Sequence, residues 1–199
     1  VDRHDGHHAE TDSAYADWLR AKGYDSADPW TDYVIAVTDE QGRTQNGWKM
    51  RHARHPARVQ DAHSETAYTT DRAIDFMTAQ GDAAWVLHLS YVQPHWPYIA
   101  PAPWHAMFTP DQCLPVSRDA AERGPGAHPV LREFQNEEVA QSFQQDDCIA
   151  TVRPAYQGLI AQLDHHLGRV WDALERLGRW DDTLVVFTSD HGDYLGDHW

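Results

Sequence analysis

An uninterrupted apolar run near the end of the chain leads directly into a group of carboxylates and imidazoles. The run, Leu184–Phe187, includes two β-branched valines. It is typical of a strand buried on both faces, as in parallel sheets covered by helices. Ligands of open α/β sheets lie beyond the carboxyl ends of the strands, and Asp190 and His191 stand at such an end. The stretch therefore predicts an α/β fold with a site at this strand end.

The residue types after this strand favour a divalent metal ion. A carboxylate supplies an oxygen ligand and an imidazole a nitrogen ligand, so Asp190 and His191 form a mixed donor pair. Gly192 and Gly196 let the backbone turn where a side chain would obstruct it. Oxygen ligands suit Ca²⁺, Mg²⁺ or Mn²⁺, and an added imidazole tolerates Mn²⁺ or Zn²⁺. We expect one divalent ion, whose identity the residues leave open.

A second strand is predicted at Trp85–Tyr91, followed by a stiff loop in which His95 stands near the start. A rigid loop holds a catalytic imidazole better than a mobile one. A surface histidine in a proline-rich turn is the alternative, but strand, loop and position together favour a catalytic role. Regular helix or central strand is excluded after the strand by four prolines: Pro94, Pro97, Pro101 and Pro103.

Helices are expected around these strands. One begins at a Ser13 cap and ends at Lys22, and a second begins at a Ser64 cap and ends at Gln80. The third, Tyr156–Leu177, has apolar residues at three- and four-residue steps, and its two histidines, His165 and His166, are expected in solvent. A glycine follows each helix as a stop. A short strand at 33–37 and a polar turn or hairpin at 39–47 complete the expected elements. Strand–helix–strand order predicts crossover helices.

Three further segments have plainer interpretations. Residues 49–63 are locally basic, but a solvated connection is favoured over an anion-contacting loop. Residues 104–150 mix Pro, Gly and charge, and are expected to form an irregular insertion or lid. Residues 1–12 are crowded with metal-ligating types, but without a defined ligand spacing a solvated loop is favoured over a metal site: His4, Asp5, His7, His8, Glu10 and Asp12.

Composition limits the partners. The net charge of −15 argues against nucleic acid. No stretch reaches the apolar length of a membrane span. Two cysteines are too few for a disulfide framework. The cytoplasm is expected, with the periplasm and secretion left open, and a homo-oligomer is also left open. The chain starts at Val1 without methionine and stops at Trp199 after its richest motif, so we interpret it as an internal fragment.

Three stretches together resemble the sulfatase family of the alkaline phosphatase superfamily. The sequence from Thr183 to Trp199 resembles its C-terminal metal motif, and the helix with Leu163-Asp164 resembles the one before that motif. The stretch Gln93–Tyr98 is similar to the central motif, closest to the phosphonate monoester hydrolase branch, which lies beside the arylsulfatases. The resemblance implies an alkaline phosphatase-like α/β fold, with a mixed, mainly parallel sheet flanked by helices, of which residues 1–199 form part of one catalytic domain.

The resemblance also implies a chemistry and site residues. The branch hydrolyses small anionic sulfate, phosphonate or phosphate esters with a divalent metal and a formylglycine made from a cysteine. Asp190 and His191 match its second group of metal ligands. His95 matches a histidine that contacts the substrate and helps the leaving group depart. His198 falls in the Gly-x-His piece and is expected to contact substrate.

Departures from the family pattern limit what this chain does alone. The family's first strand with its aspartates, its nucleophile segment and a lysine after the Gly-x-His piece are absent. Cys113 begins a stretch, ending in Arg118, that resembles the nucleophile signature Cys-x-Pro-x-Arg. Arg118 is one residue too far, and the stretch lies after His95 instead of before it. Cys113 is therefore interpreted as an ordinary loop cysteine, and the fragment is expected to be inactive.

Two alternatives stay open. A phosphodiesterase or a phosphoglycerate-mutase-like member of the superfamily would share the Asp-His pair but use Thr or Ser with two metals. A non-catalytic binding module would keep the fold, with the acidic surface serving a partner. A Cys-x-Pro-x-Arg segment before Val1 would favour the sulfatase-like branch, and a Thr or Ser there the first alternative. Purification without stoichiometric divalent metal would favour the second alternative.

Overall fold

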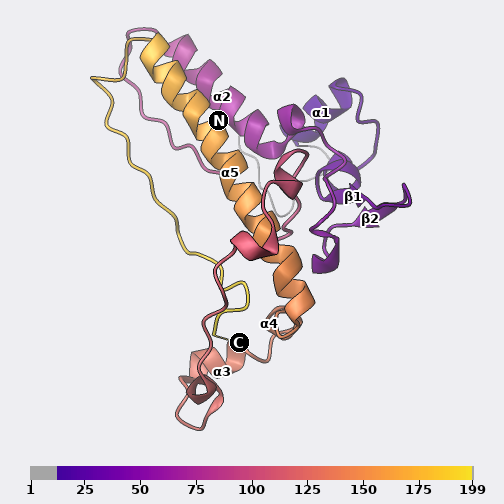
Figure 1. Ribbon diagram of the computed structural model, residues 1–199. Coiled ribbons are helices and arrows are strands. Elements are labelled where there is room, and N and C mark those ends of the chain that lie inside the picture. Colours follow the sequence, from indigo (N-terminus) through magenta and orange to yellow (C-terminus); the bar gives the residue numbers. More distant parts are fainter. Residues whose placement is uncertain (1–12, 199) are drawn as a thin grey trace.

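The computed structural model describes residues 13–198. Two long helices, α2 (Glu65–Gln80) and α5 (Asp146–Arg176), lie side by side, and the other elements are arranged around them (Figure 1). The predicted cap of α2 is confirmed, because the Ser64 hydroxyl accepts a hydrogen bond from the Ala67 N–H at 3.2 Å. The predicted stop is also confirmed, with Gly81 at a φ of 54° that favours glycine. Residues 1–12, for which a solvated loop was favoured over a metal site, lie outside the described residues.

Helix α5 is longer than the sequence predicts. It starts at Asp146, not at Tyr156, and includes Pro154 within its 31 residues. Proline lacks the N–H that an interior helical position donates, so the sequence pattern placed the start beyond it. Asp146 and Asp147 in the first turn favour the helix through its macrodipole. Residues 146–150 therefore belong to the main helix and not to the irregular segment.

The solvation expected for the two histidines of α5 is half right. His165 is exposed, with its ring centroid 5.5 Å from that of Trp104. His166 is buried, so the prediction for it is wrong. Its Nδ1 lies 3.0 Å from Arg169 and its Nε2 3.6 Å from the Asp61 carboxylate. The Asp61 carboxylate is a neighbour from a distant part of the chain, which local sequence does not reveal.

The N-terminal part packs as a small helical and hairpin unit. Helix α1 (Ala14–Ala21) is capped by Ser13 as predicted. A π-helical turn, η2 (Trp30–Val34), takes the place of the first part of the predicted strand. The expected hairpin is present as two short antiparallel strands, β1 (Ala36–Thr38) and β2 (Thr44–Asn46), with Ala36 opposite Asn46.

Short helices make up most of the other connections. Between the proline-rich loop and α5, the chain forms short helices joined by turns and loops. No helix of residues 13–198 combines the length and apolarity that crossing a bilayer requires. The short helices are η3 (Met50–His52), η4 (Asp61–His63), η5 (Trp104–Ala106), η6 (Pro110–Gln112), η7 (Ala120–Arg123), α3 (Pro129–Phe134) and α4 (Glu138–Ser142).

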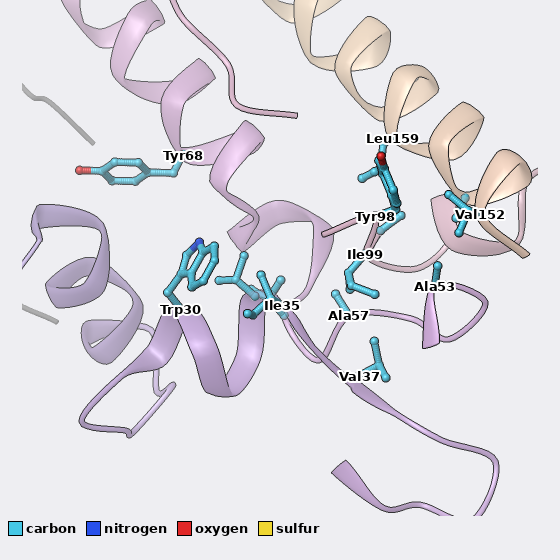
Figure 2. Close-up of a cluster of buried hydrophobic side chains, with 14 of the residues drawn as sticks. Trp30, Ile35, Val37, Ala53, Ala57, Tyr68, Tyr98, Ile99, Val152 and Leu159 are labelled. Atoms are coloured by element: carbon cyan, nitrogen blue, oxygen red, sulfur yellow. The ribbon is translucent and has the colours of Figure 1, made fainter. Parts of the chain in front are cut away.

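The main core lies between the hairpin unit, the proline-rich loop and α5. Figure 2 shows Ile99 of the loop between Ala57 and the α5 side chains Val152 and Leu159. Leu159 is fully buried. A second, smaller cluster joins α2 to α5 through buried Met77 and neighbours on α5. The first cluster fixes α5 relative to the loop that carries His95, and the second fixes α5 relative to α2 and to the extended segment before that loop.

The two strands predicted at the site are extended but join no β-ladder among residues 13–198. In the first, Trp85, Leu87 and Leu89 pack against the α2–α5 cluster, while Val86 between them is 93% exposed. In the second, Leu184–Phe187 is exposed throughout, with Leu184 at 89%. The prediction of a strand buried on both faces at Leu184–Phe187 is wrong among residues 13–198. A strand needs hydrogen-bonded neighbours, and the described residues supply none here.

Candidate active site

His95 is carried by a firmly anchored loop. The Trp96 ring packs edge-on against Trp48 with centroids 4.5 Å apart, and Ile99 and Ala100 are buried in the core. The Ala57 N–H donates to the Ala100 carbonyl at 2.9 Å. The His95 side chain itself is exposed, and its Nδ1 donates to the Trp96 carbonyl at 2.7 Å. The loop that the prolines were expected to stiffen is thus anchored in the core, and it exposes the His95 imidazole to solvent.

His191 lies against His95. The two ring centroids are 6.4 Å apart and the ring planes meet at 71°. Two of the residues predicted for the site, from distant parts of the chain, therefore come together. The His191 Nδ1 donates to the Gly192 carbonyl at 2.9 Å. This hydrogen bond, followed by the charge of Asp190, raises the pKa of His191 above its ordinary value.

Asp190 and His191 can contribute to one metal ion. The Nδ1 hydrogen bond of His191 leaves Nε2 as the ligating nitrogen of the neutral ring. This Nε2 lies 3.8 Å from Asp190 Oδ2. Ligand bonds of about 2.1 Å each allow both atoms to reach one ion. Both side chains are exposed, so the donor chemistry and the spacing fit.

The described residues do not complete such a site. Across positions 13–198, no group of three or more His, Cys, Asp or Glu side chains is placed to hold a metal. A divalent ion takes four to eight ligands in proteins, of which Asp190 and His191 supply two. The fit is therefore that of one side of a site.

Asp193 connects the metal motif to the proline-rich loop. Burial raises the pKa of the Tyr98 phenol, and the charge of Asp193 and a hydrogen bond with it raise that pKa further. The Tyr98 ring packs edge-on against Tyr156 of α5, with centroids 5.8 Å apart. Asp193 thus faces a tyrosine three residues after His95 and helps hold the two motifs together.

His198 lies in different surroundings. Its ring Nδ1 is 2.6 Å from the Glu122 carboxylate, and its backbone N–H donates to the Ser117 carbonyl at 2.9 Å. The Gln135 side chain, at the end of α3, donates to the His198 carbonyl at 3.1 Å. The structure therefore holds the expected substrate-contacting His198 on the irregular segment and brings only His95 and His191 together.

Two arginines that were not predicted from the sequence bind the turn Leu195–Asp197, just before His198. Arg153 of α5 contacts Leu195 and Asp197, and Arg118 contacts Gly196. Arg153 shows in the sequence only as a polar residue before a helical proline, and Arg118 only as the end of the misplaced nucleophile-like stretch. Neither pattern signals the turn that they bind.

Cys113 has the surroundings of an unreactive thiol. Its Sγ lies 3.6 Å from the Thr109 carbonyl and 3.6 Å from the Gln157 side chain. Burial raises the pKa of the Cys113 thiol despite the nearby Arg153, so the thiol form is favoured over the nucleophilic thiolate. Arg118 faces Gly196 instead. These contacts support the interpretation of Cys113 as an ordinary loop cysteine.

Sequence comparison places the chain among sulfatases. The sulfatase family model matches residues 3–199. The multifunctional alkaline phosphatase superfamily protein PehA of Trinickia caryophylli is 34% identical over 154 residues, which cover 72% of this chain and 30% of PehA. An arylsulfatase of Clostridium perfringens is 27% identical over 195 residues, covering 92% of this chain and 35% of that protein.

Solved structures agree in architecture. A phosphonate monoester hydrolase of Agrobacterium radiobacter superposes with a TM-score of 0.76 at 30% identity, covering 93% of this chain and 37% of that one. The enzyme of the same name from Silicibacter pomeroyi gives a TM-score of 0.74 at 31% identity, covering 92% and 37%. The chain spans about a third of the length of these relatives. The neighbours confirm the alkaline phosphatase-like α/β class as a partial domain, and the chain belongs to the sulfatase family.

Proposed function

We propose that the chain is part of a metal-dependent hydrolase of sulfate or phosphonate esters. The observation that carries the proposal is the contact of His95 with His191, whose ring centroids are 6.4 Å apart. It joins a histidine on a rigid loop to the Asp-His pair of the metal motif. The names of the relatives, arylsulfatase and phosphonate monoester hydrolase, support the substrate class.

Each residue has a distinct part in the proposed reaction. His95, exposed beside the pair, donates a proton to the departing ester oxygen. Asp190 and His191 would hold one side of a divalent ion, Mn, Ca, Mg or Zn, which when bound offsets charge on the sulfuryl or phosphoryl oxygens. The nucleophile, a formylglycine in this proposal, is supplied from outside these residues. His198 contacts the anionic substrate from the irregular segment.

The same proposal assigns the chain to part of one larger catalytic domain, with residues 104–150 as its irregular lid. Leu184–Phe187 and the outer side of 85–91 are exposed and extended, which is the form of strands awaiting neighbours. Strands contributed by the remainder of the domain would cover them. The isolated 199 residues are accordingly expected to bind metal weakly and not to turn over substrate.

Two other functions make different predictions. A superfamily member with a Thr or Ser nucleophile and two metals would hydrolyse phosphodiesters and would contain no formylglycine. A binding module would purify without stoichiometric metal. The substrate is expected to be a small anionic ester. The cytoplasm remains the expected compartment, with the periplasm and secretion open, and a homo-oligomer also remains open.

The test is an assay of the full-length protein, expressed with its native flanking sequence and loaded separately with each of the four metals. Hydrolysis of an aryl sulfate and an aryl phosphonate monoester is measured alongside a phosphodiester. Mass spectrometry of the peptide that carries the nucleophile identifies formylglycine, threonine or serine. Hydrolysis of neither sulfate nor phosphonate ester, with metal bound, would overturn the proposal.

A further inference from the structure

Arg153 is buried against the turn that ends the metal motif. From α5, its guanidinium donates to the Leu195 carbonyl at 3.0 Å, to the Leu114 carbonyl at 2.6 Å and to the Asp197 carboxylate at 2.5 Å. The residue is only 9% exposed. A buried cation with three acceptors is strongly localised, because each lost acceptor would leave charge uncompensated.

Arg118 also binds this turn. It donates to the Gly196 carbonyl at 2.7 Å and to the Phe143 carbonyl at 2.6 Å. The turn needs such support, since Leu195 has a φ of 49°, a conformation that costs energy for a residue with a side chain. The two arginines thus fix three consecutive residues, Leu195 to Asp197.

The contact network continues from Asp197 to His198. The Asp197 carboxylate that binds Arg153 also accepts the Ser117 N–H at 2.7 Å. The Ser117 carbonyl in turn accepts the His198 N–H at 2.9 Å. Glu122 binds the imidazole itself. The His198 side chain is therefore held by Glu122 and is linked through Ser117 to the contact between Arg153 and Asp197.

The stretch just before the turn is tied down less. The hydrogen bonds of Ser189, Asp190 and His191 join residues within two positions of each other. The next fixed points along the chain are Asp193, at Tyr98, and the turn gripped by Arg153. Displacing this turn would move His198 directly and release one of the two supports of the metal motif.

We propose that Arg153 is a positioning residue that sets substrate affinity through Asp197 and His198, and that Asp197 is its anchor and not a metal ligand. The inference rests on the proposed function, because it takes His198 as a contact to an anionic ester. Arginine is required because its planar fork presents several donors at once, whereas a lysine ammonium cannot reach acceptors in three directions with the same geometry.

The experiment uses the full-length, metal-loaded protein with Arg153→Lys, His198→Gln and the double variant. Arg153→Lys is expected to raise KM for an aryl sulfate and an aryl phosphonate about tenfold, the effect of one lost charge-assisted hydrogen bond, with kcat changed less than about threefold. If Arg153 acts through His198, adding Arg153→Lys to His198→Gln raises KM no further.

The matched control is Arg169→Lys, on the same helix. Arg169 binds Asp71 at 2.5 Å, the same separation as Arg153 to Asp197, but on the α2 side. The Arg169→Lys variant should leave KM unchanged. Thermal melting of every variant separates loss of folded protein, which lowers the apparent kcat alone, from loss of affinity. If Arg153→Lys melts early, Asp197→Asn, which keeps the shape of the anchor, is expected to raise KM in its place.

A second readout separates this inference from the proposed function. Calorimetric titration with inorganic sulfate measures oxyanion binding whether or not the protein hydrolyses esters. Weaker sulfate binding in Arg153→Lys and His198→Gln, without further loss in the double variant, supports the inference. Absent sulfate binding in the wild type, additive effects, or unchanged KM and affinity in Arg153→Lys would each overturn it.

Discussion

The imidazole of His191 packs edge-on against that of His95, with ring centroids 6.4 Å apart and an interplanar angle of 71°. One ring stands on a loop locked into the core by Trp96 and Ile99, and the other on an exposed stretch held near Asp193. The rigid side of the pair is thus the proposed proton donor. The more exposed side is the proposed metal-binding motif, which ligation would fix further.

Replacing His95 tests the proposed proton donor. In the full-length enzyme, His95→Gln should lower kcat by about 10²–10⁴-fold, the range of general acid catalysis. The loss should be largest for esters with poor leaving groups, because these depend most on protonation. Steady-state kinetics over a series of aryl esters measures this. His88→Gln, at an exposed position on the preceding extended segment, is the control and should change kcat little. Equal losses for good and poor leaving groups would contradict the assignment.

Replacing Asp190 tests the proposed metal ligand. Asp190→Asn keeps the size of the side chain but removes the charge that makes a carboxylate a strong ligand. Metal occupancy of the full-length protein, measured by elemental analysis after dialysis, should fall along with activity. Asp181→Asn, an exposed carboxylate at the start of the same segment, should retain its metal. Full occupancy and an unchanged rate in Asp190→Asn would remove this residue from the site.

Local sequence predicted the parts of the fold that depend on local contacts. Ser13 and Ser64 cap their helices as expected, because a cap needs only the next three residues. The start of α5 was misplaced by ten residues, since Pro154 interrupts the pattern while tertiary packing tolerates it. The strand expected at Leu184–Phe187 has no ladder among residues 13–198, because pairing depends on segments far away in sequence or beyond it.

The site was predictable to the same degree. His95 and His191 were each assigned to the site from the extended segments that precede them, and the structure brings the two rings together. The grip of Arg153 on Asp197 could not be predicted, because nothing near either residue marks a partner 44 positions away. The placement of His198 follows from that contact and from Glu122, so it too was beyond local reasoning.

Asp61 predicts a pH dependence of stability. Burial alone would raise the pKa of its carboxyl, but the nearby His166 imidazole and hydrogen bonds from Gln162 and Trp104 outweigh it and hold that pKa below its ordinary value of 3.8. A lowered folded-state pKa means that the stabilisation is complete above pH 3.8 and is lost as the pH falls through the folded-state value.

Asp61→Asn should therefore lower the free energy of unfolding by about 1–3 kcal/mol at pH 7, the cost of weakening hydrogen bonds to a charged group. The difference from wild type should shrink below pH 3.8. Urea denaturation at several pH values measures it. Asp75→Asn, at a side chain that is 66% exposed and pairs with Arg72 on the surface, should change stability by less than about 0.5 kcal/mol throughout. A difference for Asp61→Asn that stays constant down to pH 2.5 would contradict the linkage.

Two glycines of α5 predict opposite effects of the same substitution. A Cβ added at Gly158 would lie 2.2 Å from the Trp104 carbonyl oxygen, whereas one added at Gly168 meets nothing within 4 Å. Gly158→Ala should push η5 away from α5 and destabilise the fold by about 1–3 kcal/mol or more, since backbone cannot yield as a flexible side chain does. Gly168→Ala should stabilise it by up to about 1 kcal/mol through helix propensity.

Chemical denaturation measures the free energy of unfolding of the two variants. Each variant is the control for the other, because the gain in helix propensity is the same at both positions. The clash at Gly158 also bears on the site. The η5 turn directly follows the proline-rich loop, so moving Trp104 loosens the segment that fixes His95. Gly158→Ala should therefore lower activity in the full-length enzyme even in conditions where it stays folded, whereas Gly168→Ala should not. Equal activity of the two folded variants would show that the seat of His95 does not depend on the contact between η5 and α5.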